Sequence, residues 1–441
     1  MLIQNNNHKI LIINLILSFL PISFILGNLI INLNIIIFIF LAFLFFGSKI
    51  FEAKFSLMDK LIILFFFYTI FNGILNNFFN FEFSNFTKKN FLLIKSISYL
   101  RFLPLYFIIK FLINKDLINF KFLFFSFGIC GLFVSVDVII QYFVGKDLFG
   151  YEASGRRLSG PFDDEYIAGS YIQRFFIFLP IALTFYAIKE RKIFYNIFIL
   201  LIFSIAVFGT ILAGNRMPLI LFILVLTLTF FYIKDFHKIL IASLFVLISG
   251  FYYLINNSEE FSIHYKNFIV KSYQITDYLK TKFSLKETQL LANANIKEME
   301  TGILTWKQNK IFGGGIKSFY FNCTKINNSV MDKYGGTNCS SHPHNYYLEI
   351  ASELGVMGLS LIISIFFIIL IKSLKFLHFS KNNLKNFKLL IPFYALFIAE
   401  IFPLKSTGSF FTTANATFLF IIISFIVGLT EYKKFKNNET S

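Results

Sequence analysis

The stretch "SHPHNYYLEIASELGVMGL", residues 341–359, marks the point where a long polar segment becomes an apolar run. Two of the six histidines of the chain, His342 and His344, flank Pro343 there. Proline suits the first turn of a helix, where its missing N–H would have no partner. We therefore expect a membrane-spanning helix to begin near residue 345, with the two histidines at its polar end.

The composition of the chain is that of a membrane protein. Its 441 residues are 56% hydrophobic and include 65 phenylalanines, and the mean hydropathy of +0.68 is far above the range of soluble domains. Apolar stretches of about twenty residues, long enough to cross a hydrocarbon core of roughly 30 Å as helices, recur along the whole chain. The first of them lacks a small-residue cleavage site, which is typical of a retained span. We expect an all-α, polytopic membrane protein.

The apolar stretches predict about twelve membrane-spanning helices. With a cytoplasmic N-terminus, the lysines concentrate in the loops of one side, as is typical of cytoplasmic loops, and both chain ends lie on that side. The predicted spans cover residues 10–26, 29–46, 60–79, 92–113, 120–145, 166–188, 193–212, 216–233, 238–255, 345–371, 387–404 and 412–430.

One connection, residues 256–344, is long and polar and falls on the outer, periplasmic side. It contains helical patterns over 262–280 and 287–308, and a structureless loop of that length is uncommon in a compact protein. We expect a folded helical cap. The chain then divides into nine spans in 1–255, the cap loop in 256–344, and three spans with a cytoplasmic tail in 345–441.

The net charge of +17 does not indicate a nucleic-acid-binding protein. The basic residues are spread through short loops and form no stripe along a soluble domain. Membrane lipids are the expected partners of a polytopic membrane protein.

Arginine is used selectively in this sequence. Six of the 41 basic residues are arginine, and five of these lie inside predicted spans or in outer loops. The guanidinium fork binds carboxylate or phosphate through two parallel hydrogen bonds, which lysine cannot imitate. Arg157, in an outer loop, and Arg216, at a tight outer turn, are therefore candidates for binding an anion. The alternative for both is an interfacial side chain that reaches the water layer.

Three ionisable residues, Arg101, Arg174 and Asp137, fall deep inside predicted spans. Ionisable residues at such depth usually pair with each other or line a cavity. We expect a structural ion pair between Asp137 and either Arg174 or Arg101, with Glu400 facing the same cavity. The alternative is that these residues line a substrate path.

His344 is the candidate for acid–base chemistry. At the N-terminus of the predicted helix, the positive end of the helix dipole disfavours a protonated imidazole, and a general base must be neutral. Ala351 and Gly355 form a small-xxx-small pair, which predicts close packing of this helix against another. The alternative for His344 is a hydrogen-bonded cap without a catalytic role.

The three cysteines fall into two environments. Cys130 lies inside a predicted span and is expected to be inert packing. Cys323 and Cys339 share the outer loop, where an oxidising periplasm would allow a disulfide that ties the chain just before His342. The alternative is two free thiols.

The sequence "HNYYLEIASELGVMG" resembles the His-Asn-x9-Gly-x-x-Gly signature of O-antigen ligases and the related O-antigen polymerases. His344, Asn345, Gly355 and Gly358 stand at its fixed positions. The stretches "RLSGPFDDEYIAGSY", "AGNRMPL" and "TWKQNKIFGGGIKSF" resemble further parts of these proteins. With the order of the spans and the single large outer loop, the resemblance covers most of residues 120–430.

The resemblance implies a membrane glycosyltransferase of lipopolysaccharide and polysaccharide biosynthesis, in the bacterial inner membrane with a periplasmic active site. Such enzymes move a glycan from undecaprenyl diphosphate to an acceptor hydroxyl. The acceptor is the lipid A–core in ligases and a second lipid-linked glycan in polymerases, and both stay open here. No metal and no cofactor take part, and the sequence has no Asp-x-Asp motif in an outer loop, no zinc-spaced cluster and no P-loop.

The resemblance also implies roles for the candidate residues. Arg157 and Arg216 would hold the donor diphosphate, and His344 would take the proton of the acceptor hydroxyl. Members of the family carry an arginine four residues before the loop tryptophan, whereas this chain has Gly302 there. The residues that would contact or orient the substrates are Asn345, Arg174, Glu349 and, in place of the missing arginine, Lys307 or Lys297.

A different class of function is a flippase or exporter of lipid-linked glycans. The intramembrane Arg101, Arg174 and Asp137 would suit a translocation path. A flippase, however, needs neither a base at the outer face nor a large one-sided cap, so the sequence favours the enzyme.

Overall fold

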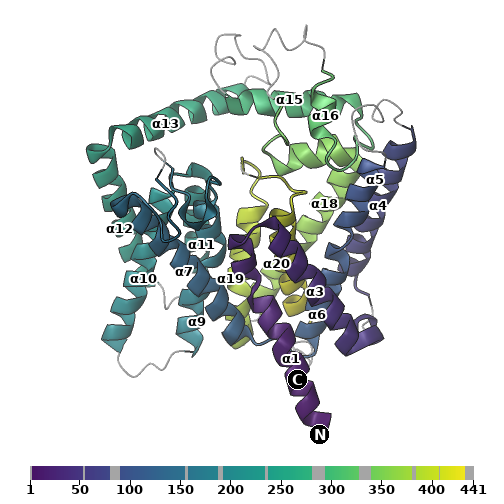
Figure 1. The fold of residues 1–441 in the computed structure, drawn as a ribbon, viewed down its shortest axis with the longest axis horizontal. Helices are drawn as coiled ribbons and strands as arrows, with labels where there is room; N and C mark the ends of the chain where they lie inside the picture. Colours follow the sequence, from purple (N-terminus) through teal and green to yellow (C-terminus); the bar gives the residue numbers. More distant parts are fainter. Residues whose placement is uncertain are drawn as a thin grey trace.

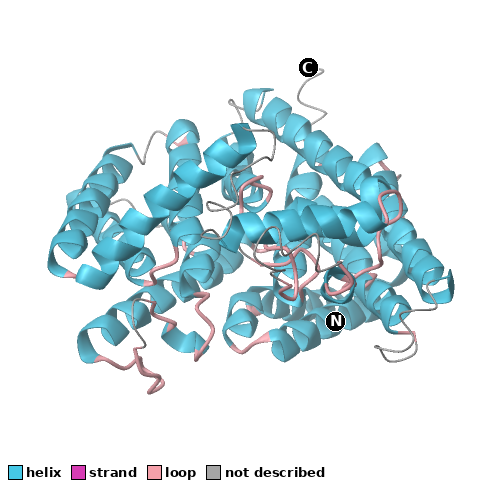
Figure 2. Cartoon of the chain, turned by 90° about the horizontal axis from the view of Figure 1, so that it is seen from above, coloured by secondary structure: helices cyan, strands magenta, loops and turns pink. Residues whose placement is uncertain are grey.

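The computed structural model describes residues 2–52, 55–79, 90–153, 157–186, 192–233, 237–280, 294–326, 339–379, 384–406 and 408–432. These residues form α-helices joined by short loops and 3-10 turns, and they contain no β-strand beyond one isolated bridge between Lys146 and Glu152. Figure 2 shows the helices from above. The all-α architecture predicted from the sequence is confirmed for the described residues.

Each of the twelve predicted spans coincides with one helix or with two consecutive helices (Figure 1). Where two helices share a span, the chain is broken, as between Tyr99 and Phe102. The helices are α1 Leu2–Ser18, α2 Leu20–Ile25, α3 Asn28–Phe46, α4 Leu57–Phe79, α5 Phe91–Tyr99, α6 Phe102–Asn114, α7 Phe120–Val144, α8 Ala168–Phe175, α9 Phe178–Tyr186, α10 Lys192–Leu212, α11 Arg216–Tyr232, α12 His237–Asn257, α13 Glu259–Lys280, α15 Ala294–Gln308, α16 Phe319–Cys323, α18 Tyr346–Phe379, α19 Leu384–Glu400 and α20 Thr413–Glu431.

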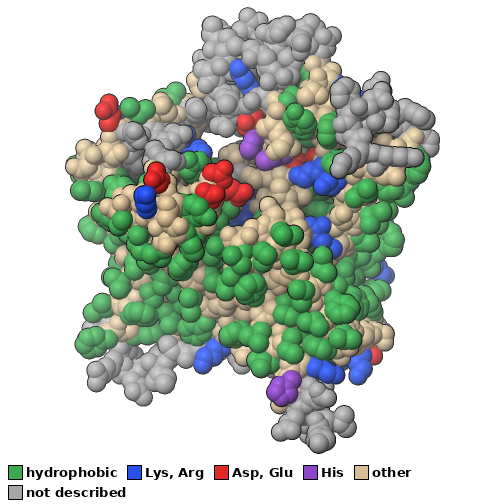
Figure 3. Space-filling view, in the orientation of Figure 1, with side chains coloured by type: hydrophobic (Ala, Val, Ile, Leu, Met, Phe, Trp, Pro, Cys, Tyr) green, Lys and Arg blue, Asp and Glu red, His purple; other side chains and the backbone are tan. Residues whose placement is uncertain are grey.

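Eight of the described helical segments are long and apolar enough to cross a membrane, and two shorter apolar helices accompany them. Figure 3 shows hydrophobic side chains around the middle of the molecule, with charged side chains gathered above and below. Exposed phenylalanines such as Phe40, Phe67 and Phe143 contribute large apolar side chains to the surface. The protein is therefore a multi-pass membrane protein, while the count of twelve crossings stays a prediction.

The helices of the polar outer segment lie across one end of the bundle. Figure 1 shows α13, α15 and α16 together at the top, with the start of α1 at the bottom. The helix predicted over 262–280 is confirmed by α13, and the second predicted helix is confirmed from residue 294 onward. Residues 281–293 and 327–338 lie outside the described part.

Buried ion pairs join helices at the end of the bundle opposite the cap. Lys110 lies inside α6, within the predicted span 92–113, and is 6% exposed. Its ammonium contacts Asp59 at 2.6 Å and Glu431 at 2.7 Å. A lysine inside an apolar helix is tolerated when carboxylates on neighbouring helices neutralise it.

A break in α18 at Gly355 is the main departure from regular helix. Gly355 has φ +69° and ψ −172° inside an otherwise continuous helix, a region that is open essentially to glycine alone. The expected use of Ala351 and Gly355 as a helix-packing pair is therefore wrong for Gly355, whose missing side chain admits backbone atoms. A Cβ there would lie 2.1 Å from the carbonyl oxygen of Ile311.

The glycine turn of the cap fills this break. The N–H groups of Gly314 and Gly315 donate to the carbonyls of Ser352 and Glu353, at 3.0 and 2.8 Å. In return, the N–H of Val356 donates to the carbonyl of Lys310 at 2.9 Å. The cap and α18 thus replace the backbone hydrogen bonds that the broken helix loses, as buried backbone groups require.

Helix α4 completes the same junction. The hydroxyl of Tyr68 donates to the carbonyl of Leu354 at 2.7 Å, and the side-chain amide of Asn72 donates to the carbonyl of Phe312. Asn72 is fully buried, so its hydrogen bond is formed away from water. Three segments far apart in the sequence are therefore fixed together beneath the cap.

The orientation can be tested with reporter fusions. A reporter fused after Lys192 should be active in the cytoplasm, and one fused after Lys280 should be active in the periplasm, because lysines mark the cytoplasmic loops. A phosphatase and a fluorescent protein, each active on one side, give the two readouts. A cytoplasmic signal after Lys280 would contradict the topology.

The glycine junction can be tested by substitution. Gly355→Ala should destabilise the protein by more than the roughly 1–3 kcal/mol that a non-glycine residue costs in such backbone conformations, because the new Cβ also meets Ile311. The measurement is the thermal unfolding midpoint in detergent. Gly250→Ala in α12 is the matched control: its nearest side-chain atom is 3.6 Å away, so its midpoint should stay or rise. Equal midpoints for both variants would refute the junction.

Candidate functional site

The polar end of α18 is capped by an asparagine. Asn345 accepts hydrogen bonds on its side-chain oxygen from the N–H groups of Tyr347 and Leu348, at 3.0 and 3.1 Å, as N-cap residues do. Its amide donates to the carbonyl of Pro403 at 2.8 Å. The helix begins at Tyr346, so the expectation that Pro343 lies in its first turn is wrong.

His344 directly precedes this cap in a left-handed conformation, with φ +49°. The rings of His342 and His344 lie close together but tilted, with centroids 4.3 Å apart and an angle of 47° between their planes. The Nε2 atom of His344 lies 3.9 Å from a carboxylate oxygen of Glu298 on α15. The cap helix therefore supplies a carboxylate beside the predicted base, and burial raises the pKa of Glu298 while His344 opposes that rise.

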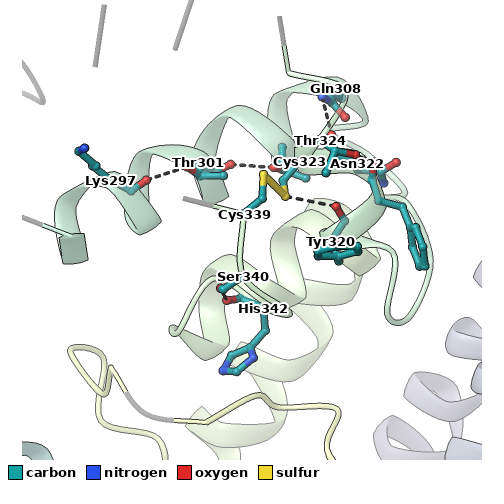
Figure 4. Close-up of a disulfide and its surroundings, with 12 residues drawn as sticks. Lys297, Thr301, Gln308, Tyr320, Asn322, Cys323, Thr324, Cys339, Ser340 and His342 are labelled. Atoms are coloured by element: carbon teal, nitrogen blue, oxygen red, sulfur yellow. Dashed lines mark hydrogen bonds between the residues drawn. A yellow bond between two sulfur atoms is a disulfide. The ribbon is translucent and has the colours of Figure 1, made fainter. Parts of the chain in front are cut away.

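His342 is held by its own loop. Its Nδ1 lies 2.9 Å from the hydroxyl of Ser341, and its carbonyl accepts from the hydroxyl of Ser340 at 2.5 Å. Figure 4 shows the ring pointing away from α15 toward the loop between α19 and α20. Burial and the charges of His344 and Lys317 lower the pKa of His342 to about 3, so the imidazole is neutral at physiological pH.

Three residues before His342, the chain is tied by a disulfide. Cys323 and Cys339 are bonded, with Cα atoms 5.9 Å apart (Figure 4). Cys323 is fully buried beside Phe319 and Ile326. The bond fastens the histidine loop to α16. Cys130 is a free thiol on α7.

A cavity of about 670 Å³ opens beside His342. Its walls come from the turn between α2 and α3, residues 161–175, the start of α11, and the loop before α20. In Figure 3, acidic, basic and histidine side chains gather around a hollow below the cap. Among the described residues, those lining the cavity include His342 and Arg174 but not His344, Arg157 or Arg216.

The two outer arginines flank one segment of the wall. The guanidinium of Arg157 lies 5.9 Å from the ring centre of Tyr166. The carbonyl of Tyr166 accepts from the side-chain amide of Asn215 at 2.6 Å, and Asn215 is the N-cap of α11, whose first residue is Arg216. Tyr166 and Asn215 both line the cavity, so the structure brings both arginines near its edge. Arg156 lies outside the described residues.

Arg174 is paired with a different residue from the one expected. Its guanidinium donates to both carboxylate oxygens of Glu400, at 2.8 and 3.2 Å, and to the side-chain oxygen of Asn415 at 2.7 Å. The predicted pairs of Asp137 with Arg174 or Arg101 are therefore wrong. Asp137 instead accepts from the N–H of Leu148 at 2.9 Å. Two side chains at the same depth along their spans need not touch, because the two side chains can point toward different neighbouring helices.

Glu400 binds a second cation that the sequence did not single out. Lys405 donates to Glu400 and, at 3.1 Å, to the hydroxyl of Tyr346. Both charged side chains are almost completely buried. Burial lowers the pKa of Lys405 to about 8, and Glu400 opposes that change. The sequence signal for Lys405 is its position in a predicted outer loop, where few lysines are expected.

Glu349 holds the loop before α20 from the other side. Its fully buried carboxylate accepts from the hydroxyl of Ser409 and, at 2.6 Å, from the N–H of Phe410. Lys317, in the glycine-turn segment, donates to the same Ser409 hydroxyl at 2.8 Å and lies 3.7 Å from Glu349. Glu349 thus supports the loop whose Ser409 lines the cavity.

The position of the missing arginine is closely packed. A Cβ at Gly302 would lie 3.2 Å from Pro343 and 3.3 Å from Leu348, so α15 rests directly on the histidine loop there. Lys307 is exposed in the last turn of α15. Glycine at this position allows the close approach that puts Glu298 beside His344.

The buried ion pair of Glu400 can be tested by neutralisation. Glu400→Gln should destabilise the protein by about 3–5 kcal/mol, because it leaves two buried cations without their carboxylate. Glu152→Gln is the matched control, since Glu152 and its partner Lys146 are exposed and 3.0 Å apart, and should cost about 0–1 kcal/mol. The unfolding midpoint in detergent measures both. Similar small losses would contradict the pairing.

Comparison with known proteins finds a family match for part of the chain. Residues 176–363 match the family model described as O-antigen ligase, and a search of curated proteins finds no match. The matched range contains Arg216, the cap, His342, His344 and both glycines of the signature, while Arg157 and Arg174 precede it. The resemblance of the histidine motif is thereby confirmed: residues 176–363 of this multi-pass membrane protein, which include that motif, are similar to the O-antigen ligase family.

Proposed function

We propose that the protein transfers a glycan from undecaprenyl diphosphate to an acceptor hydroxyl at the periplasmic face of the bacterial inner membrane, in the manner of an O-antigen ligase. The observation that carries the proposal is the position of the family's histidine motif, at a broken helix beside a cavity under the cap. The lipid A–core is the proposed acceptor, and no metal ion or cofactor takes part.

The reaction is a direct displacement. His344 takes the proton from the acceptor hydroxyl, and the freed oxygen attacks the anomeric carbon of the donor sugar. The bond between this carbon and the diphosphate oxygen breaks, so that undecaprenyl diphosphate leaves and the anomeric centre inverts. Glu298, 3.9 Å from the ring of His344, stabilises the imidazolium that the proton transfer produces.

The departing diphosphate carries the developing negative charge. Arg157 and Arg216 flank Tyr166 and Asn215 at the edge of the cavity, and their guanidinium groups are suited to hold a diphosphate bidentately. Asn345, Arg174 and Glu349 fix the loops around the reacting groups through hydrogen bonds. Lys307, exposed on the cap, contacts the substrate as it enters.

A gene deletion in living cells distinguishes the proposal from its alternatives. When the gene is deleted and the surface glycolipid is run on a gel, a ligase deletion removes all O-antigen chains from the core. Core carrying a single repeat would instead identify a polymerase. Core without chains, with lipid-linked glycan accumulating on the cytoplasmic side and not on the periplasmic side, would favour a flippase and contradict the proposal.

Variants in that deletion strain test the roles of charge and geometry. Arg157→Lys and Arg216→Lys keep the positive charge and lose the guanidinium fork, so each should lose most of the glycan transfer. His344→Ala should lower the rate by about 10² to 10⁴ and leave donor binding intact. The readouts are surface glycan on a gel and the amount of lipid-linked donor retained by the purified protein.

Two results would contradict these roles. Full transfer by His344→Ala would place the base elsewhere, and full transfer by both lysine variants would exclude bidentate diphosphate binding. Lys146→Arg, at an exposed surface pair, is the control for a Lys–Arg exchange outside the site and should leave transfer unchanged.

A further inference from the structure

The charges around the cavity argue against a phosphate ligand inside it. Among the described residues that line it, Arg174 is the one arginine or lysine, and its guanidinium already binds Glu400 and Asn415. Asp163, Asp164 and Glu165 are exposed at the same wall. A diphosphate would meet more negative than free positive charge here, so it fits better at the flanking arginines.

The remaining lining suits a neutral, hydroxyl-rich ligand. Three tyrosines, Tyr151, Tyr166 and Tyr171, line the cavity with polar groups such as Ser170. Aromatic faces and carboxylate acceptors are complementary to the C–H faces and hydroxyl groups of sugars. The volume of about 670 Å³ lies within the roughly 300–1,000 Å³ of small-molecule pockets.

His342 lines this cavity and carries a polar atom without a hydrogen-bond partner among the described residues. Its Nδ1 contacts Ser341, whereas its buried Nε2 has no hydrogen-bond partner among the described residues. A buried polar atom without a partner costs about 1–3 kcal/mol, so its retention indicates a ligand group that pairs with it. A hydroxyl group pairs with either tautomer of the neutral ring, because it both donates and accepts.

The loop holds this atom in place by several contacts. The Cys323–Cys339 bond, the hydroxyls of Ser340 and Ser341, and the ring of His344 all restrain the histidine. Such restraint is typical of a binding group whose position matters.

From these observations we propose that the cavity is a sugar-binding subsite and that the Nε2 atom of His342 is its hydrogen-bonding contact to a sugar hydroxyl. The inference rests on the proposed function and deepens it, because it separates the sugar subsite from the diphosphate site at Arg157 and Arg216. The sugar belongs either to the donor glycan or to the acceptor, and the two sources share the same chemistry.

A protection experiment tests the subsite independently of glycan transfer. Ser170→Cys in a Cys130→Ala background places one reactive thiol in the cavity wall and leaves the native disulfide. The rate of modification by a water-soluble maleimide is measured with three probes: the core oligosaccharide freed of lipid, the glycan released from the lipid-linked donor, and inorganic diphosphate. One of the two oligosaccharides should slow modification at least about fivefold and thereby identify the source of the sugar, whereas diphosphate should not.

Substitution of the histidine tests its role as the contact. His342→Phe keeps an aromatic ring beside His344 and removes the polar atom, so the half-protecting sugar concentration should rise about tenfold, as expected for one lost hydrogen bond. His342→Gln should recover part of the protection. His8→Phe, at an exposed position of α1, is the matched control and should behave like the parent.

The protection experiments can fail while the proposed function holds, and the proposed function can fail while they succeed. Protection by diphosphate alone, or by no oligosaccharide, would overturn the sugar subsite even if the enzyme transfers glycan. Protection that His342→Phe leaves unchanged would overturn the role of His342. Protection by sugar in a protein that transfers nothing would support the subsite and reject the transferase.

Discussion

The docking of the glycine turn into the break of α18 is the interaction on which the site depends. Without a side chain at Gly355, the backbone of residues 310–315 reaches the opened helix and replaces its lost hydrogen bonds. This contact sets the distance between the cap and the membrane helices. It therefore decides where α15 brings Glu298 and where the loop before α18 carries its two histidines.

Buried charges then fix the opposite wall of the cavity. The loop between α19 and α20 is held through Lys405 by Glu400 and through Ser409 by Glu349, and Arg174 joins the same network from α8. Each of these carboxylates accepts from groups on at least two segments. Because a buried charge without partners is costly, this arrangement favours one geometry of the loop, and with it one shape of the cavity that His342 faces.

Much of this organisation was predictable from the sequence. The twelve apolar stretches and the polar segment coincide with helices and with the cap because composition and periodicity are local properties. The partners of Arg174 and Asp137 were not predictable, because depth along a span does not say which neighbour a side chain faces. Gly355 was noticed but interpreted as a helix contact, since its role depends on a turn forty residues earlier. His342 is not one of the fixed positions of the family signature, and only the fold shows which of the two rings lines the cavity.

Reconstitution of the purified protein into vesicles is the most direct measurement of the central claim, that this site joins a glycan to an acceptor. Vesicles would contain a labelled lipid-linked glycan and the lipid A–core, and the label would be followed together with released undecaprenyl diphosphate. The account predicts label on the acceptor and an equal amount of released diphosphate lipid. Movement of intact lipid-linked glycan between leaflets, without label on any acceptor and without diphosphate release, would contradict it.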